Sequence, residues 1–393
     1  MQDVATLIKQ DRLVELTRTL VEIPSVTSQE HSLADWVFDY LTSLGMDEIK
    51  RLPVEDAGDT IVSCLEGSQD GPGMLLLFHL DTFDVCDGWH TDPFKAVRDG
   101  NRLHGLGIHD MKAGGACILG TLEAIVQSGT KLGGRLYVVA TTDEENWSRG
   151  AYEVINSGLL KKCICGLNPE PTARGEVRIG QRGRHVFHLT LKGRTIQASY
   201  DHDEGINAVV DAAKLVTTLD QIPRQALGVN EAYNITGNLA VTSIQGGSTM
   251  ILIPERAHVY LDRHTIPGQT AESEAELLRK IIEQSKIKST VQIEWDDRPT
   301  PAPPAYIVPE DAVIVREIDR QIQAEYNEPP TFVIGRSVND ASHFTVYGGI
   351  PTLLYGPQGG NTCKANEYLE VDSLVPTTRI YLNTVLNILG VNQ

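Results

Sequence analysis

The sequence predicts an α/β protein with a mostly parallel sheet, interrupted by a small α+β domain. Two observations support this prediction. Outside the middle of the chain, short apolar runs without alternation are separated by helical patterns, which is typical of parallel strands buried on both faces. In the middle, apolar and polar residues alternate, which is typical of a sheet with one exposed face. The chain of 393 residues is long enough for two domains, at roughly 100–200 residues each.

The elements of the parallel domain follow in chain order. Leu13, Leu16, Leu20 and Val21 recur at helical spacing, and Pro24 ends that helix. The same spacing predicts a second helix over 32–44, and the Ala-, Leu- and Ile-rich segment 113–128 predicts a buried one. Unbroken apolar runs predict buried strands at 74–78, 136–140, 163–167 and 351–355.

The middle of the chain predicts a separate α+β domain over 180–292. Strands are expected at 185–192, 238–244 and 258–261, and amphipathic helices at 207–219 and 271–285. Residues 298–304 are rich in proline and are expected to be the return linker. The parallel domain would then consist of residues 1–179 and 293–393, resuming with a helix near 312–326.

The composition excludes several classes of protein. Lys plus Arg number 34 and Asp plus Glu 52, so the formal charge is −18. A protein that binds nucleic acid through its phosphates, or a membrane through a polybasic anchor, would carry basic faces instead. There is no apolar run of the roughly 20 residues that span a bilayer, and no signal-peptide pattern at the N-terminus. We therefore expect a cytoplasmic protein without membrane or nucleic-acid partners, whose six cysteines are free thiols.

Chemistry-bearing side chains follow the predicted parallel strands where these strands end. His79 and Asp81 follow the first strand, Asp143-Glu144-Glu145 the second, and Asn168-Pro169-Glu170 the third. Asp110 precedes the buried helix. Each group alone could be a solvated loop, but the carboxyl ends of parallel strands meet at one edge of a sheet. One His and several carboxylates there favour Zn²⁺, Mn²⁺ or Co²⁺ over Ca²⁺, and two metals bridged by one carboxylate would serve hydrolysis.

The same residues, in order along nearly the whole chain, resemble the M20 family of metallopeptidases and deacylases. The matching motifs are Glu22-Ile23-Pro24-Ser25 with Glu30, His79-Leu80-Asp81, Trp89 with Asp92-Pro93-Phe94, Gly107 to Lys112, Asp143-Glu144-Glu145, Glu170-Pro171-Thr172, Gly246-Gly247 with Ile253-Pro254, Asp262-Arg263, Asn339-Asp340-Ala341, Gly356-Pro357 and Asn366-Glu367-Tyr368. The resemblance implies a zinc-peptidase-type catalytic domain interrupted by a lid that usually dimerises, so a homodimer is expected.

The resemblance also implies a role for individual residues. His79, Asp110 and Glu170 would bind one metal, and Asp110 would bridge to a second that Glu145 also binds. Glu144 would be the general base, and Asp81 would orient His79. Gln197, Arg263, Asn339 and Gly356 lie where the family contacts its substrate. The expected cofactor is Zn²⁺, two ions per chain, with Co²⁺ or Mn²⁺ as alternatives.

Three positions depart from the family pattern. Cys363 stands where the family has its last metal-binding His, and a thiolate there would favour zinc. Gln197 stands where the lid usually carries a His that polarises the scissile carbonyl, and His202 is a nearby alternative. Ile251 replaces the usual Asn after the Gly-Gly pair.

These departures leave three functions open. The leading hypothesis is a binuclear hydrolase that cleaves the amide bond of an N-acyl amino acid or a small peptide, because the base and four ligands are intact. The second keeps the metal site for acyl transfer or amide formation in a specialised pathway. The third is a degenerate, non-catalytic paralogue that serves as a binding subunit.

Overall fold

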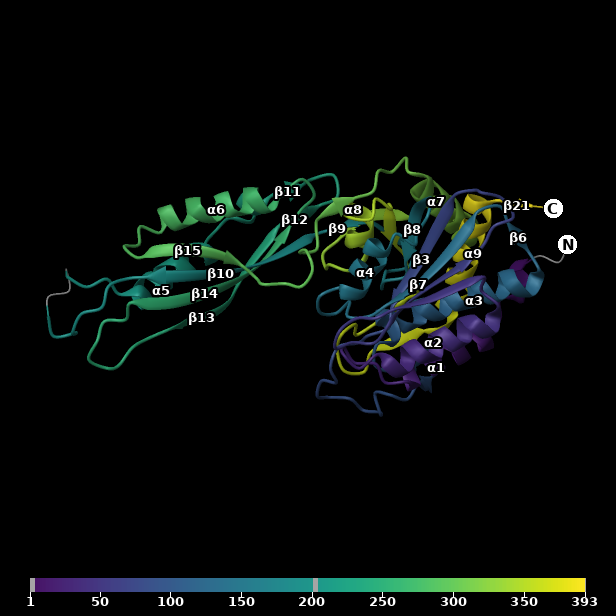
Figure 1. The fold of residues 1–393 in the computed structure, drawn as a ribbon, viewed down its shortest axis with the longest axis horizontal. Helices are drawn as coiled ribbons and strands as arrows, with labels where there is room; N and C mark the ends of the chain where they lie inside the picture. Colours follow the sequence, from purple (N-terminus) through teal and green to yellow (C-terminus); the bar gives the residue numbers. More distant parts are fainter. Residues whose placement is uncertain (1–3, 201–203, 393) are drawn as a thin grey trace. The chain divides into compact units, whose positions relative to one another are not determined.

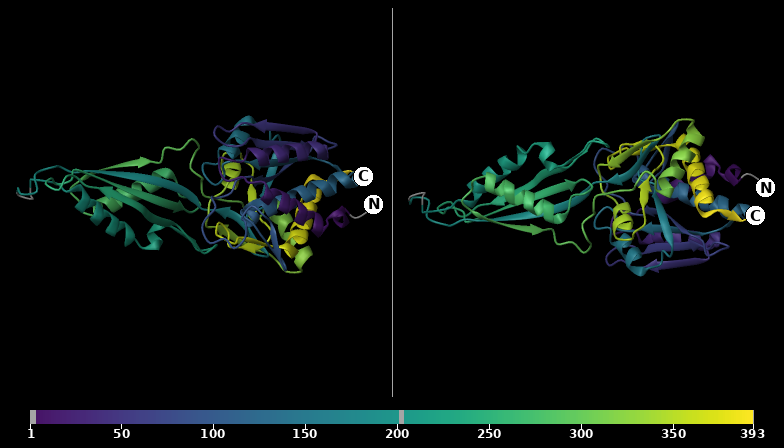
Figure 2. Two further views of the ribbon diagram at one scale, coloured as in Figure 1. Left: turned by 90° about the horizontal axis from the view of Figure 1, so that it is seen from below. Right: turned by 90° about the horizontal axis from the view of Figure 1, so that it is seen from above.

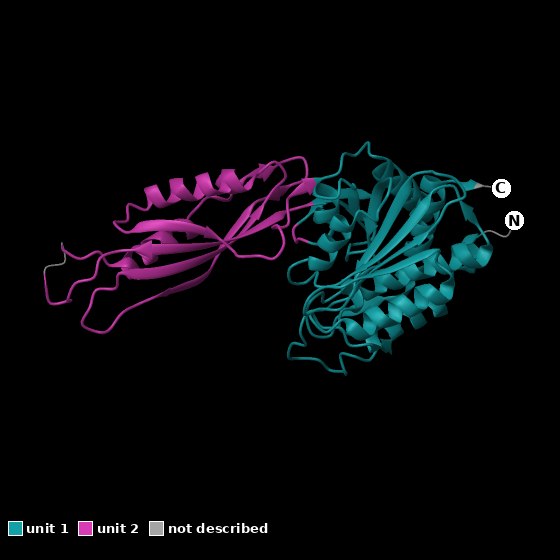
Figure 3. Ribbon diagram, viewed as in Figure 1, with its two compact units in different colours: residues 1–180, 307–335, 339–393 teal, residues 181–306, 336–338 magenta. Residues whose placement is uncertain are grey.

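The computed structural model describes residues 4–200 and 204–392, which form two compact units (Figure 3). The first unit comprises residues 1–180, 307–335 and 339–393, and the second comprises 181–306 and 336–338. His202 lies outside the described residues. No helix among the described residues is long and apolar enough to cross a membrane.

A mixed sheet forms the centre of the first unit (Figure 1). Its order is β1-β2-β7-β3-β8-β18-β9-β16, with β17 also paired to β9. These strands are β1 (Glu48–Leu52), β2 (Thr60–Leu65), β3 (Gly73–His79), β7 (Arg135–Thr141), β8 (Cys163–Asn168), β9 (Glu176–Gln181), β16 (Tyr306–Ile307), β17 (Thr331–Gly335) and β18 (Thr352–Leu354). The predicted parallel pairing holds for β7, β3, β8 and β18. The pairs β1–β2, β2–β7 and β18–β9 are antiparallel, so the sheet as a whole is mixed rather than mostly parallel.

Helices cover both faces of this sheet. They are α1 (Gln10–Glu22), α2 (His31–Leu44), α3 (Ala113–Ser128), α4 (Arg149–Ser157), α7 (Val313–Tyr326), α8 (Ala341–Val346) and α9 (Leu374–Leu389). One face is covered by α3 and α9, which contact each other and β3. On the other face, Val154 of α4 and Phe344 of α8 pack with Leu75, Leu77 and Val139. Because β3 is buried along its whole length, its apolar run shows no alternation.

Several short elements of the first unit were not predicted. They are η1 (Val4–Leu7), η2 (Ile108–Lys112), η4 (Val371–Ser373), β4 (Val97–Asp99), β5 (Arg102–His104), β6 (Lys131–Leu132), β19 (Gly359–Gly360), β20 (Tyr368–Glu370) and β21 (Val391–Asn392). The strands β19-β20-β5-β4 form a small antiparallel sheet. This sheet brings the segment around Gly359 to Glu370 beside the loop that leads into η2.

The second unit is the expected α+β domain. It contains β10 (Gly183–Lys192), α5 (Ala208–Asp220), η3 (Arg224–Leu227), β11 (Val229–Asn230), β12 (Ile235–Thr236), β13 (Asn238–Gly246), β14 (Arg256–Thr265), α6 (Ala271–Gln284) and β15 (Thr290–Trp295). The antiparallel sheet has the order β13-β14-β10-β15. Both α5 and α6 lie on one face of this sheet (Figure 2), where Leu215 and Ile281 pack against Phe187, Leu189 and Val259.

The expected boundary at residue 293 is wrong. Residue Ile293 pairs with Leu189, and Trp295 pairs with Phe187, so the chain is still part of the β10–β15 ladder there. The second unit consequently extends through the proline-rich segment to Tyr306. The expected boundary lies inside β15, the last edge strand, because no sequence pattern marks where that strand ends.

Candidate metal centre

The ends of the parallel strands bring together the His and the carboxylates that the sequence singled out. His79 is the last residue of β3 and is 2% exposed. Glu144 and Glu145 lie in the turn after β7, Glu170 follows β8, and Asp110 lies within η2, just before α3. One ligand atom from each of His79, Asp110 and Glu145 lies within 4.8 Å of the others. This is the spacing that donors of one metal centre require.

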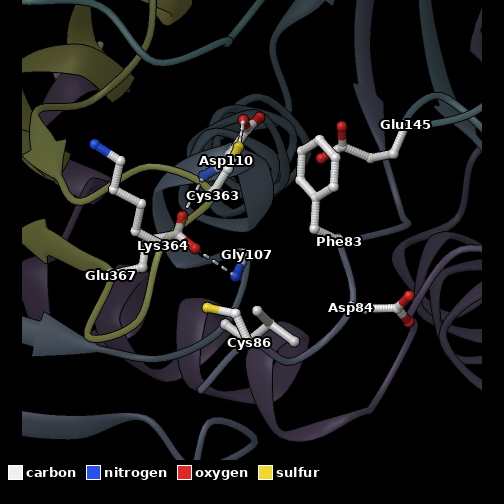
Figure 4. Close-up of a pocket in the computed structure, with 10 residues that line it drawn as sticks. Phe83, Asp84, Cys86, Gly107, Asp110, Glu145, Cys363, Lys364 and Glu367 are labelled. Atoms are coloured by element: carbon white, nitrogen blue, oxygen red, sulfur yellow. Dashed lines mark hydrogen bonds between the residues drawn. The ribbon is translucent and has the colours of Figure 1, made fainter. Parts of the chain in front are cut away.

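The carboxylate of Asp110 is contacted on both of its oxygens. Its Oδ1 lies 3.3 Å from Nε2 of His79, and its Oδ2 lies 3.2 Å from Sγ of Cys363. Figure 4 shows the thiol of Cys363 next to the Asp110 carboxylate, with Glu145 across the pocket. A carboxylate with one candidate ligand on each side has the arrangement of a bridge between two cations.

Asp81 contacts His79 mainly through its backbone oxygen, whereas a contact through its carboxylate was expected. Nδ1 of His79 lies 3.0 Å from the backbone oxygen of Asp81 and 3.6 Å from its Oδ1. The carboxylate instead accepts hydrogen bonds from the backbone amides of Glu144 and Glu145, at 3.1 and 3.0 Å, and from the hydroxyl of Thr27. Asp81 therefore orients His79 mainly through its carbonyl and holds the turn that carries the two glutamates through its side chain.

Burial destabilises the ionised form of these acids unless a cation neutralises their charge. Burial raises the pKa of Glu170 to about 8, and the charge of Asp110 adds to this effect. Burial also raises the pKa of Glu144 and of Glu145 well above the usual range. Oε1 of Glu145 is buried and has no hydrogen-bond partner. An orphaned carboxylate oxygen among like charges fits metal ligation, since a divalent cation would satisfy the oxygen and offset the repulsion.

A pocket opens beside this cluster (Figure 4). Asp110, Glu145 and Cys363 line one part of it, and Phe83 and Leu106 supply apolar surface. A small molecule entering this pocket would reach the candidate ligands directly.

One of the expected acids does not belong to the cluster. The carboxylate of Asp143 is fully buried and pairs with Arg149, whose Nε lies 2.7 Å away. Its charge is therefore neutralised within the turn. The run of three acids after β7 divides into one structural carboxylate and the two glutamates of the candidate site.

Sequence reasoning missed two carboxylates that hold the site. Glu367 accepts hydrogen bonds from the amides of Gly107, His109 and Asp110, each 2.9 Å long. Glu30 accepts from the amides of Gly58 and Asp143, both at 3.1 Å. Both residues belong to the motifs quoted for the family resemblance, which was their only signal in the sequence. Their function as acceptors depends on loops distant in the chain.

Three of the expected substrate contacts have structural roles. Arg263 is 1% exposed, and its guanidinium binds Glu274 at 2.5 Å and the carbonyl of Leu227 at 2.8 Å, so it is not available to a substrate. Asn339 is buried, and its Oδ1 accepts from the amide of Ala341. Both backbone polar groups of Gly356 are bonded to the hydroxyl of Thr172.

The fourth expected contact, Gln197, is exposed and lies in the second unit. Its backbone pairs with that of Leu252 in an isolated β-bridge. Ile251 is 63% exposed. The six cysteines are free thiols, as expected, and only Cys86 and Cys363 are exposed.

Comparison with known proteins agrees with this fold. The model of peptidase family M20/M25/M40 matches residues 75–387. A succinyl-diaminopimelate desuccinylase of Methylobacterium radiotolerans is 29% identical, over 94% of this chain and 95% of its own. An acetylornithine deacetylase of Edwardsiella ictaluri is 28% identical, over 93% and 94%. The crystal structure of the aminopeptidase PepT from Bacillus cereus superposes with a TM-score of 0.81 at 17% identity, covering 97% of this chain and 99% of that one.

The fold and the acidic cluster define a metal-dependent hydrolase. The chain belongs to peptidase family M20/M25/M40.

Proposed function

We propose that this protein is a binuclear zinc hydrolase that cleaves the amide bond of an N-acyl amino acid or a small peptide. The observation that carries the proposal is the Asp110 carboxylate, with His79 on one oxygen and Cys363 on the other. The names of the relatives, a desuccinylase, a deacetylase and an aminopeptidase, support the substrate class. We also propose a cytoplasmic homodimer, with the second unit as lid and dimerisation domain.

The ligands divide into two groups around Asp110. His79 and Glu170 would hold one ion, and Glu145 and Cys363 the other. Glu170 is 7% exposed, and its Oε1 accepts a hydrogen bond from the side-chain Nδ2 of Asn168 at 3.5 Å. Bound zinc ions would polarise the scissile carbonyl and lower the pKa of a water molecule to near neutrality.

Glu144 is proposed as the general base. Its Oε2 lies 4.0 Å from Nε2 of His79, and its side chain is 7% exposed. Glu144 lies beside the group formed by His79, Asp110 and Glu145 but does not belong to it. Its carboxylate is therefore placed to accept a proton from the attacking water. The same carboxyl group would then deliver that proton to the leaving nitrogen, which balances the hydrolysis.

Two further residues would support the reaction. Asp81 fixes the position of Glu144 and Glu145, because its carboxylate binds both of their amides. Gln197 is proposed to donate a neutral hydrogen bond to the carbonyl oxygen of the substrate. A carboxamide cannot become a cation as an imidazole can, so we expect slower turnover than with a His at this position.

The proposal is tested by metal content and by activity on a panel of substrates. The panel should contain N-acetyl and N-succinyl amino acids, dipeptides and tripeptides, assayed with Zn²⁺, Co²⁺ or Mn²⁺ and after chelation. We expect two zinc ions per chain and release of a free amine that stops on chelation. A protein with two tightly bound metals that cleaves no member of the panel would point away from hydrolysis of small amides.

A further inference from the structure

The side chain of Glu367 is the common acceptor for the loop that delivers Asp110. It is 1% exposed. Its Oε2 accepts from the amide of Gly107, and its Oε1 accepts from the amides of His109 and Asp110. Gly107 has a left-handed backbone, with φ of 67°. The loop therefore turns around one carboxylate before it enters α3.

Glu367 also belongs to the segment that carries Cys363. The turn between them is closed by Nδ2 of Asn361, which donates to the carbonyl of Asn366 at 3.1 Å, and by the amide of Lys364, which donates to the carbonyl of Asn361. Immediately after Glu367, strand β20 begins and pairs with β5. The turn that carries Cys363 therefore leads directly through Glu367 into the start of β20.

The neighbouring contacts tie the same two loops together. Nδ1 of His109 lies 2.8 Å from the hydroxyl of Thr362. Asn366 accepts from the amide of His90 and donates to the carbonyl of Gly88, which anchors the turn on its other side. Among these contacts, Glu367 makes the largest number to the Asp110 loop, and it alone bonds the amide of Asp110 itself.

We propose that Glu367 is a positioning residue that sets the separation between the carboxylate of Asp110 and the thiol of Cys363. This inference rests on the proposed function, because these two side chains are the proposed ligands of the second metal. Glu367 binds the backbone of one ligand and shares a short turn with the other. Metal sites tolerate only about 0.5 Å of ligand displacement. A loosened loop would displace Asp110, which serves both ions, relative to Cys363, which serves only the second, so the second ion would be weakened more than the first.

A purely structural role predicts something different. If Glu367 only stabilised the fold, its substitution would lower the unfolding temperature and leave the affinities of the metals unchanged. A positioning role predicts a loss of affinity at the second metal that exceeds any change at the first. The two roles are therefore separated by metal titration rather than by activity.

The experiment compares Glu367→Gln with Glu370→Gln. Gln keeps the size of the side chain but replaces one acceptor oxygen by an amide donor, which would face the amide of Gly107. Glu370 is a matched control, since it lies on β20 and its carboxylate makes no contact with the Asp110 loop among the described residues. Zinc binding is measured by competition with a chromogenic chelator, starting from chelated protein.

We expect Glu367→Gln to bind the second zinc about 10–100-fold more weakly, with a smaller loss of affinity at the first, as for other residues that orient metal ligands. We also expect zinc to protect Cys363 from iodoacetamide in the wild type and in Glu370→Gln, but not in Glu367→Gln, as measured by peptide mass spectrometry. Wild-type affinity for both ions in Glu367→Gln would overturn the inference, whatever its unfolding temperature.

Two further cases are covered by additional measurements. If Glu367→Gln does not fold, Glu367→Asp retains the carboxyl group but shortens its reach, and the same larger loss of affinity at the second ion is expected. If the wild type itself binds one zinc, the binuclear proposal fails, and Glu367 is then tested on that ion, for which Asp110 remains a ligand. An unchanged affinity for that single ion in the Glu367 variant would overturn the positioning role as well.

Discussion

Sγ of Cys363 lies 3.2 Å from Oδ2 of Asp110. A thiol that faces a candidate bridging carboxylate is placed to become a ligand once a metal displaces its proton. We predict that Cys363→Ala lowers the zinc content from two ions per chain to one, as measured by atomic emission after gel filtration. Cys86→Ala is the matched control, because Cys86 is the other exposed thiol of the same pocket. Two zinc ions retained in Cys363→Ala would exclude thiolate ligation.

The general base is tested by Glu144→Gln. The carboxamide keeps the shape of the side chain but cannot accept the proton, so we expect kcat to fall by about 10²–10⁴-fold or more. Zinc content should stay close to two, since Glu144 is not a proposed ligand. Glu153→Gln, an exposed position on α4, should be unaffected in both measurements. An active Glu144→Gln variant would mean that another group takes the proton.

The lid contact is tested by Gln197→Ala. If the carboxamide binds the carbonyl oxygen mainly as charge develops there, kcat should fall by about 10²-fold while KM changes little. The complementary Gln197→His variant should raise the turnover of simple N-acetyl amino acids. Steady-state kinetics on the best substrate of the panel provide the measurement. Unchanged kcat in Gln197→Ala would place the carbonyl donor elsewhere.

Removal of the metal should make the protein less stable as the pH rises through neutrality. Burial raises the pKa of Glu170 and of Glu367 to about 8, and that of Asp340 to about 6. A raised carboxyl pKa contributes stability that is complete below the unfolded-state pKa and is lost as the pH rises through the folded-state pKa. Chelated protein should therefore be less stable at pH 8 than at pH 6. Glu170 and Glu367 contribute most of this loss, about 1.4 kcal/mol each per pH unit while the group is ionised in the unfolded state and protonated in the folded state.

Thermal unfolding at the two pH values, with chelator and with zinc, measures this effect. Zinc should remove the loss at pH 8, because the cation favours the ionised carboxylates. A chelated protein that is equally stable or more stable at pH 8 would show that the acids are stabilised by other means.

The close approach at Gly356 gives a fifth prediction. A Cβ at this position would lie 2.4 Å from the backbone oxygens of Pro169 and Glu170. Gly356→Ala should therefore push the 169–170 loop away, lower the affinity for the first zinc and destabilise the protein by about 1–3 kcal/mol. Zinc titration and thermal unfolding of the variant provide the test. Normal zinc affinity would mean that the loop relaxes without moving Glu170.

The sequence could predict which chemically active residues gather at one edge of the sheet, because each of them lies next to a local apolar run. The apolar run of β3 ends in His79 and that of β7 precedes Glu144, and parallel strands present such residues at one edge of a sheet. The antiparallel strand β1 escaped prediction because it has no buried residue and therefore no apolar run, and β2 because its burial is set by its partners β1 and β7. Similarly, the family resemblance led to the expectation that Arg263 contacts substrate, because no sequence pattern indicates its buried partner Glu274.

The sequence by itself determined the family, the division into two domains and the residue types of the candidate metal centre, because these depend on spacing along the chain. The tertiary structure decided which acids face one another. Asp143 and Glu144 are adjacent in the chain, yet one pairs with Arg149 and the other approaches His79. Glu367 holds the Asp110 loop across more than two hundred and fifty residues of intervening chain. Hydrogen bonds and charge pairing act through space, so only the folded chain assigns their partners.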